Sequence, residues 1–215
     1  MTESEAGQLR QGAARLGVAI DASAVTRLGR FLDLLDIWNR RLRLTGDRDR
    51  RVLLGKHVVD SLAVVPELPE AGMVVDVGSG AGFPGIVLAC VRPELSFALI
   101  EPRRRPTSFL SEVIRTVPLP SVLALEMRAE EAAQAAAVAG RARLVVSRAL
   151  RVDRLLELAP GFLAADGLLV AMQTPSLSED QAGRRAQARG LVLVRSRDYH
   201  LPGGESRRLF VFGRS

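Results

Sequence analysis

The chain has 215 residues, of which 47% are hydrophobic and 25% charged, a composition that supports one sizeable core. The single cysteine, Cys90, excludes an intramolecular disulfide, and no apolar run approaches the roughly 20 residues that span a bilayer. The first residues lack the pattern of a signal peptide, so we expect a cytoplasmic protein without membrane association.

Residues 1–70 are expected to form an N-terminal helical extension. Within Ala22–Leu42 the apolar residues recur three and four positions apart, which is the spacing of one helix face, and Asp21 is a suitable N-cap. A basic, turn-like stretch follows at residues 43–51. A second helix is predicted from about Val52 to Val65, where a proline follows.

From Met73 onward, short apolar runs alternate with helical stretches, which is typical of a parallel sheet covered by helices on both faces. The strands are predicted at Val74–Val77, Ser96–Ile100, Val122–Leu125, Leu144–Val146, Leu168–Ala171, Leu191–Arg197 and Arg207–Phe212. The helices are predicted at Pro84–Val91, Thr107–Arg115, Glu130–Ala137, Arg154–Phe162 and Ser178–Ala188. The turn at Leu201–Gly204 indicates a hairpin between the last two strands. Residues 71–215 are therefore expected to form one α/β domain with a seven-stranded, mostly parallel sheet.

A glycine-rich segment, Asp76-Val-Gly-Ser-Gly-Ala-Gly82, follows the first strand and precedes a helix. Its glycines remove side chains where a ligand approaches the backbone, and ligands of open α/β sheets bind at this edge. A dinucleotide fingerprint requires glycine at position 83, which is Phe83 here. The segment instead resembles the S-adenosylmethionine loop of class I methyltransferases, with Gly78 and Gly80 at the cofactor. An NAD-dependent dehydrogenase and a tight turn without a ligand are the alternatives.

Two acidic residues follow the next strands. Glu101 ends the second strand, where a carboxylate can accept hydrogen bonds from both hydroxyls of a ribose. S-adenosylmethionine and NAD both carry such a ribose, so Glu101 does not separate the two cofactors. Glu130 follows the third strand, where methyltransferases usually place the adenine, whereas the neighbouring Glu131 is explained by the dipole of a helix start.

The net charge of +6 comes almost entirely from arginine, since Lys56 is the only lysine. A GC-rich genome produces such a bias, and so does an RNA partner whose phosphates pair with guanidinium groups. The run Arg103-Arg-Arg105 allows the same two interpretations, a solvated helix start or a phosphate contact.

Ser147-Arg-Ala149 follows the fourth strand, and His57, Asp60 and Ser61 lie within one turn of the second predicted helix. Ser147 has no partners in the order of a catalytic triad, which argues against a hydrolase. A lone histidine is more often structural than catalytic, and no spacing of His, Cys and Asp indicates a metal site.

Taken together, these motifs resemble the RsmG (GidB) family, which methylates guanine N7 in bacterial small-subunit ribosomal RNA. The resemblance covers about residues 30 to 212. Its motifs are Trp38-Asn39, Leu44-Thr45, His57-Val-Val-Asp-Ser-Leu62, Asp76 to Gly85, Ser147-Arg-Ala149, Leu201-Pro-Gly203 and Arg208-Leu209. The Phe83-Pro-Gly85 extension and the His-x-x-Asp-Ser-Leu segment make the match specific.

The resemblance implies a class I, Rossmann-like methyltransferase fold and a site built from several loops. The cofactor contacts that it implies are Gly78, Gly80, Phe83, Glu101, Ala129, Glu130 and Arg148. The substrate contacts are expected at His57, Asp60, Arg105 and Arg148. Guanine N7 already has an exposed lone pair, so no catalytic acid or base is expected.

Two positions depart from the family's pattern. Arg43 stands where the family usually has Asn, and Gln173-Thr174 stands where it usually has Lys-Gly. These departures bear on the substrate more than on the cofactor. The expected partner is 16S ribosomal RNA or a precursor of the small subunit, and we expect a monomer without metal. The alternatives are a methyltransferase of the same fold acting on another RNA or a small molecule, and a degenerate RNA-binding protein.

Overall fold

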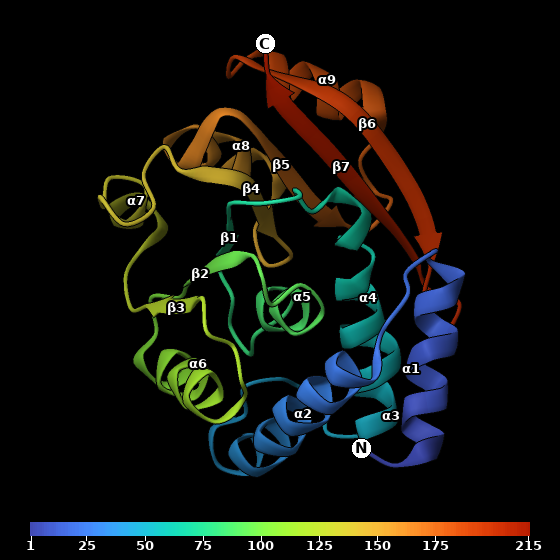
Figure 1. The fold of residues 1–215 in the computed structure, drawn as a ribbon. Helices are drawn as coiled ribbons and strands as arrows, with labels where there is room; N and C mark the ends of the chain where they lie inside the picture. The colour runs from blue at the N-terminus through green and yellow to red at the C-terminus, as the bar shows by residue number, and fades with distance from the viewer.

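The computed structural model describes residues 1–215, and its centre is one seven-stranded sheet with the order β3-β2-β1-β4-β5-β7-β6 (Figure 1). The strands are β1 Met73–Val77, β2 Ser96–Ile100, β3 Val122–Leu125, β4 Ala142–Ser147, β5 Leu163–Gln173, β6 Leu191–His200 and β7 Ser206–Arg214. The first five strands pair in parallel, and β7 runs antiparallel to both β5 and β6. The predicted mostly parallel sheet and its final hairpin are confirmed.

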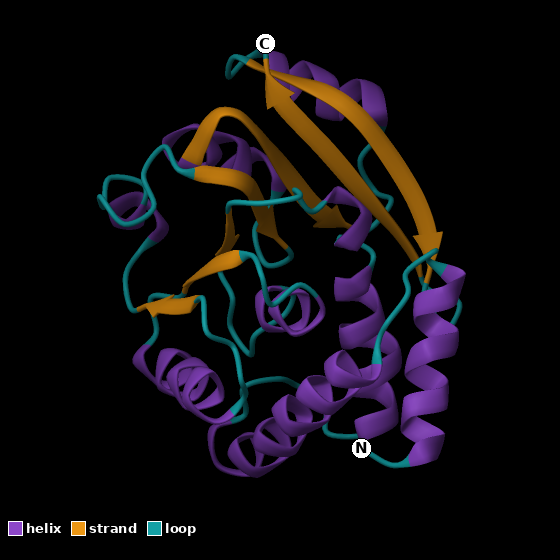
Figure 2. Ribbon diagram, in the orientation of Figure 1, coloured by secondary structure: helices purple, strands orange, loops and turns teal.

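Helices cover both faces of the sheet (Figure 2). They are α1 Glu3–Arg15, α2 Ala22–Leu42, α3 Arg50–Val52, α4 Val59–Leu62, α5 Gly85–Val91, α6 Arg104–Thr116, α7 Ala129–Ala132, α8 Val152–Phe162 and α9 Glu179–Gln187. Alternate residues of the strands enter different cores, as the two-residue period of a strand requires. Val74 joins the core beneath α2, α5 and α6, whereas Val75 joins the core beneath α8 and α9.

The N-terminal helices share the first of these cores with the sheet. Leu9 of α1 and Phe31 of α2 belong to the same buried cluster as Leu99 of β2. The prediction for α2 is confirmed at both ends, and Asp21 accepts a hydrogen bond from the Ala24 N–H at 2.6 Å. The N-terminal helices therefore pack against the sheet in a shared core. The division of the chain into an extension of residues 1–70 and a domain of residues 71–215 stays a prediction.

The single regular helix predicted over 52–65 is wrong in its form. The chain passes from α3 into a π-helix, η1 Leu53–Val58, then into α4 and a short 3-10 helix, η2 Val65–Glu67. The hydrogen bonds of a π-helix span five residues instead of the four of an α-helix, so its turns are wider than the spacing of three and four predicts. It therefore changes which side chains after Leu53 face the sheet, and such turns occur frequently at functional sites.

The helix predicted at Glu130–Ala137 is also shorter in the structure. It ends at Ala132, and turns continue to Gly140, whose φ is +65°. Alanine favours a helix, but a four-residue helix lacks the length to be stable without packing. No helix of the structure combines the length and apolar character that crossing a membrane requires.

Candidate active site

The carboxyl ends of the parallel strands place the predicted loops along one edge of the sheet. Gly78 follows β1, Glu101 follows β2, and Ser147 ends β4 beside β1. The N–H groups of Gly78 and Ser79 both donate to the Ile100 carbonyl, at 2.9 and 3.1 Å. These two bonds fix the start of the glycine loop against the end of β2.

The glycine loop has a backbone that only glycine adopts easily. The φ angles of Gly78, Gly80 and Gly82 are +81°, +53° and +92°, in the left-handed region that costs other residues roughly 1–2 kcal/mol. The Gly80 N–H donates to Glu101 Oε2 at 3.0 Å. The loop therefore places the backbone of Gly80, where a Cβ would meet no atom nearer than 3.9 Å, next to a buried carboxylate, as a bound nucleoside requires.

Glu101 is 2% exposed, although it is a charged residue. Its Oε1 atom accepts hydrogen bonds from the backbone N–H and the Nε of Arg103, at 3.0 and 2.8 Å. The Arg103 side chain is 70% exposed, so it can move away when ribose hydroxyls need the same oxygen atom. The Glu101 carboxylate thus fits as the acceptor for the ribose hydroxyls of the cofactor.

Asp76 lies behind the loop and is buried completely. Its Oδ2 accepts a hydrogen bond from the Gly85 N–H at 3.0 Å, whereas Oδ1 has no partner. Burial raises the pKa of Asp76 to about 6. This carboxyl group therefore fastens the start of α5 to β1, and one of its oxygen atoms remains unpaired beneath the loop.

Phe83 lies between the N-terminal helices and the loop after β4, and it is only 4% exposed. Its ring lies 5.4 Å from that of Phe31 in an edge-on arrangement and 5.1 Å from the His57 ring. The Arg148 guanidinium lies 5.2 Å from the centre of the Phe83 ring. Phe83 thus brings His57 and Arg148 together, although 91 residues separate them along the chain.

His57 is fixed by a loop that the sequence did not mark as part of the site. Its Nε2 lies 2.8 Å from Asp47 Oδ2, and this bond is the main reason for the lowered pKa of Asp47. Asn39 holds that loop, because its side chain donates to the Asp47 carbonyl and accepts from the Thr45 N–H. The pKa of His57 itself is lowered by burial and then by the nearby charge of Arg148, so the ring is neutral at pH 7.

Asp60 is buried beside this group and is 3% exposed. Its Oδ1 accepts a hydrogen bond from the Tyr199 hydroxyl at 2.6 Å, and Arg148 Nη1 lies 3.4 Å from Oδ2. Arg207 Nε is farther away, 3.9 Å from Oδ1. Neither Tyr199 nor Arg207 was predicted as a site residue.

A cavity of about 420 Å³ lies beside these residues, beyond the ends of β4 and β5. Its lining consists of Lys56, His57, Asp60, Arg148, Ala149, Leu150, Arg151, Met172, Gln173, Thr174 and Arg207. Four of these side chains are cationic and one is a carboxylate, so the cavity favours an anionic ligand. Its size lies within the range of small-molecule sites, which is about 300–1,000 Å³.

Comparisons with known proteins agree with this geometry. The model of the family described as rRNA small subunit methyltransferase G (GidB) matches residues 24–203. The chain is 34% identical to the Ribosomal RNA small subunit methyltransferase G of Geobacter sp. strain M21, over 100% of both chains. It is 39% identical to the protein of that name from Anaeromyxobacter dehalogenans strain 2CP-1, over 93% of both chains.

The chain belongs to the rRNA small subunit methyltransferase G family. Its fold resembles that of the TehB-like SAM-dependent methyltransferase from Corynebacterium glutamicum, with a TM-score of 0.56 and 14% identity. That match covers 87% of this chain and 99% of the solved one. The predictions of the family, of a class I methyltransferase fold and of S-adenosylmethionine as the cofactor are confirmed.

Within this member of the methyltransferase G family, two predicted cofactor contacts lie at the third strand end. Ala129 begins α7, and Glu130 is exposed and forms an ion pair with Arg154. An adenine that binds there has to share the Glu130 carboxylate with Arg154. Ser147 has a structural role. Its buried hydroxyl donates to the Val77 carbonyl at 2.7 Å and joins β4 to β1.

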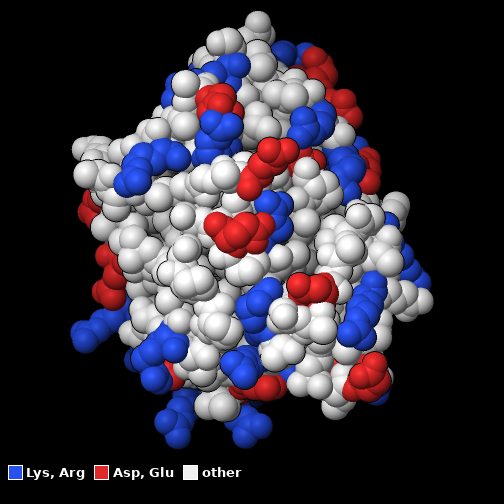
Figure 3. All heavy atoms as spheres, in the orientation of Figure 1, with Lys and Arg blue, Asp and Glu red and all other residues white.

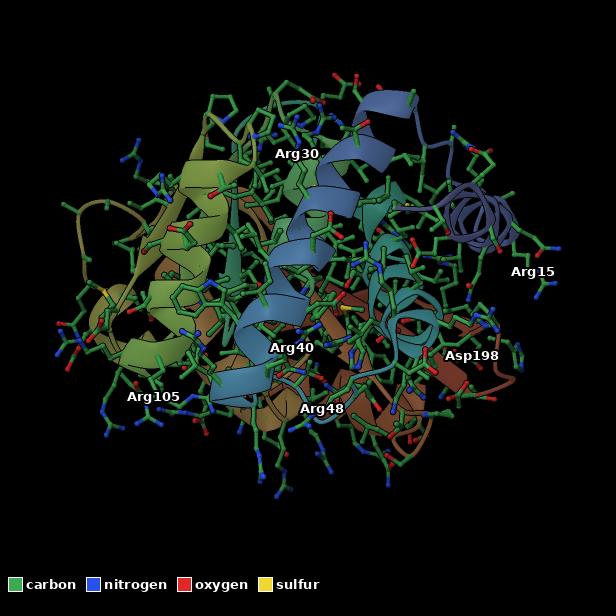
Figure 4. The ribbon with its side chains drawn as sticks, turned by 90° about the horizontal axis from the view of Figure 1, so that it is seen from below. Arg15, Arg30, Arg40, Arg48, Arg105 and Asp198 are labelled. Atoms are coloured by element: carbon green, nitrogen blue, oxygen red, sulfur yellow. The ribbon has the colours of Figure 1, made fainter.

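Arg105 does not line the main cavity. It lies with Arg43, Arg103 and Arg104 around a second cavity of about 260 Å³, between the end of α2 and the start of α6. Figure 3 shows acidic and basic groups interspersed on the face of Figure 1, with basic groups projecting along its lower edge. Figure 4 views that edge from below, and Arg40, Arg48 and Arg105 lie toward one side of it, away from Arg30.

The departure at Gln173 has a structural role. Its side-chain amide donates to the Leu150 carbonyl at 3.1 Å and joins the end of β5 to the loop after β4. Because Lys56, Arg151 and Arg207 line the same cavity, the cavity keeps its cationic character without the family's lysine. The absence of that lysine therefore does not remove the anion-binding character of the site.

Arg43, the other position that departs from the family's pattern, has an unusual backbone conformation. Arg43 ends α2 in the left-handed conformation, with φ 49° and ψ 53°, where glycine and asparagine are favoured. We expect Arg43→Gly to stabilise the protein by about 1 kcal/mol, because the strain of a Cβ in this conformation is removed. Thermal or denaturant unfolding measures the change.

Arg30 provides the matched control, since it is exposed and lies in the interior of the same helix. Arg30→Gly should destabilise the protein by about 1 kcal/mol, because glycine is a poor helix former. Equal shifts in the same direction for both variants would show that the conformation of Arg43 is not strained.

Proposed function

We propose that this protein transfers the methyl group of S-adenosylmethionine to N7 of a guanosine in 16S ribosomal RNA of the small subunit. The observation that carries the proposal is the cationic cavity, which adjoins the strand ends that hold the glycine loop and is lined by Arg148. The relatives' printed name, Ribosomal RNA small subunit methyltransferase G, supports the same substrate class. A cytoplasmic location follows from a ribosomal substrate.

The cofactor side of the proposal uses residues of the first three strand ends. When bound, S-adenosylmethionine supplies an electrophilic methyl group. We assign the ribose to Glu101, the close backbone approach to Gly78 and Gly80, and the adenine side to Ala129 and Glu130. Phe83 is buried beneath Arg148, so its contribution is to shape the wall between the cofactor and the cavity.

The substrate side uses the cavity. Guanine N7 carries an exposed lone pair and needs no general base, so the task of the chain is to hold the base in line with the methyl group. Arg148 is suited to this task because its planar donor set can bind the base or its phosphate. The neutral His57 forms part of the wall, and Lys56, Arg151 and Arg207 can neutralise phosphates near the extruded base.

Arginines outside the first cavity offer further sites for phosphates. Arg105 and Arg43 lie around the second cavity, and phosphates of the RNA flanking the target base are the ligands that suit them. These arginines favour RNA over a small molecule, because a small substrate would fill the first cavity alone.

Methyl transfer from labelled S-adenosylmethionine to small subunits isolated from a strain without the modification tests the proposal. We expect label in 16S ribosomal RNA and an N7-methylguanine at one position after digestion and mapping. Naked 16S ribosomal RNA, assembled subunits, transfer RNA and a mixture of small metabolites are tested in parallel. Label in another RNA or in a metabolite, with none in 16S ribosomal RNA, would favour the alternative substrates instead.

A further inference from the structure

We propose that Tyr199 is a positioning residue for methyl transfer: its hydroxyl holds the Asp60 carboxylate, and Asp60 holds Arg148 at the cavity. This inference rests on the proposed function, because Arg148 acts on the substrate there. It assigns a task to the final hairpin, which contains none of the predicted site residues.

The Asp60 carboxylate is the centre of the arrangement. It is 3% exposed, and a buried carboxylate has to be matched by donors. The Tyr199 hydroxyl donates to Oδ1 at 2.6 Å, which leaves Oδ2 directed at Arg148 Nη1, 3.4 Å away. The two oxygen atoms thus have separate donors, and the hydrogen bond from Tyr199 fixes the orientation in which the carboxylate faces the arginine.

Tyr199 is itself held rigidly. It stands opposite Arg207 in the β6–β7 pairing and is 6% exposed. The Arg197 guanidinium lies 5.8 Å from the centre of its ring and donates to the Ala63 carbonyl just after α4. Burial raises the pKa of the Tyr199 hydroxyl well above its usual value, so it remains a hydrogen-bond donor at physiological pH.

Arg148 depends on this support because its side chain has many rotamers. Its guanidinium makes one hydrogen bond, to Asp60 Oδ2, and one cation–π contact, with the Phe83 ring at 5.2 Å. Without the Tyr199 hydroxyl, Asp60 Oδ1 loses its hydrogen-bond donor, and the cation on that side of the carboxylate is Arg207, whose Nε lies 3.9 Å from Oδ1. The carboxylate can then turn toward Arg207, and Arg148 loses its fixed position at the cavity wall.

The variant Tyr199→Phe removes only the hydroxyl. At saturating cofactor we expect about a tenfold lower kcat for methyl transfer to small subunits, the size of one lost hydrogen bond to a charged group. Ser196→Ala is the matched control, since Ser196 of the same strand also donates a hydroxyl to a carboxylate, Glu179 Oε1, at 2.6 Å. That bond lies on the surface, and its loss should leave kcat within twofold.

A double-mutant cycle separates positioning from general stability. In an Arg148→Ala background, Tyr199→Phe should cause no further loss of kcat beyond twofold, because the residue through which it acts is absent. A second tenfold loss in that background would overturn the proposal, because Tyr199 would then act independently of Arg148.

Nuclear magnetic resonance of the arginine side chains tests the arrangement without any RNA. The Arg148 signals, identified by their loss in Arg148→Lys, should show slow rotation about the Nε–Cζ bond in the wild type and fast rotation in Tyr199→Phe. Equal rotation in both proteins would overturn the proposal. Absence of methyl transfer by the wild type would instead overturn the proposed function, and the rotation measurement would still decide the role of Tyr199.

Discussion

Replacing Glu101 by glutamine is expected to lower the affinity for S-adenosylmethionine about 100-fold, as the loss of two hydrogen bonds from ribose hydroxyls to a charged acceptor implies. A glutamine amide accepts through one atom only and places a donor against the N–H of Gly80 or Arg103, which now donate to the carboxylate. Calorimetry with S-adenosylhomocysteine measures the affinity, and the melting temperature reports any loss of fold.

Two control variants accompany this change. Arg103→Ala removes the guanidinium that now bonds Glu101 and should leave the affinity within about threefold, since that side chain is mostly exposed. Glu112→Gln changes a partly exposed carboxylate of α6, which pairs with Arg115 and Thr116, and should leave the affinity for the cofactor unchanged. Normal affinity in Glu101→Gln would remove Glu101 from the cofactor site and with it the present assignment of the ribose.

Replacing Gly85 by alanine is expected to destabilise the protein by about 3 kcal/mol, at the upper end for an added methyl group in a packed core. A Cβ at this position would overlap the Leu99 side chain and lie 2.6 Å from Asp76 Oδ2. The variant must push α5 away from β1 and β2 and weaken the bond from the Gly85 N–H to Asp76. Calorimetric unfolding should show a melting temperature lower by on the order of 10 °C.

Gly7→Ala is the matched control for this prediction, because a Cβ at Gly7 in α1 meets no atom within 4 Å. Alanine is the better helix former, so this variant should be stabilised by about 0.5–1 kcal/mol. A neutral Gly85→Ala variant would mean that α5 is not held closely against the sheet and that the glycine serves another purpose.

The sheet could be predicted well because its signals are local. The ranges of β2 and β3 agree with their predictions at both ends, since each strand is a short apolar run between turns, although β3 lies at the sheet edge and is not buried. The π-helix at Leu53–Val58 could not be predicted, because its apolar residues fit the ordinary helical spacing as well. The length of α7 could not be predicted for a related reason, since an alanine-rich stretch favours a helix without specifying where it ends.

Some residues of the candidate site could likewise be identified from local patterns, and others could not. The glycine loop and Glu101 could be identified because each directly follows a strand, and parallel strands end at one edge. Tyr199 and Asp47 could not, because their contacts depend on the register of a distant hairpin and on how Asn39 holds a loop. A local pattern carries no information about a contact across 139 residues, which is the separation of Tyr199 from Asp60.

That separation also bears on the order in which the molecule is completed during its synthesis. All five parallel strands and the glycine loop precede residue 174, whereas the donor for Asp60 comes from β6, in the last 25 residues. The residues that build the nucleoside corner are therefore synthesised before the residue that supports Asp60. The support of Arg148 at the cavity has to wait for a strand that follows the whole parallel part of the sheet.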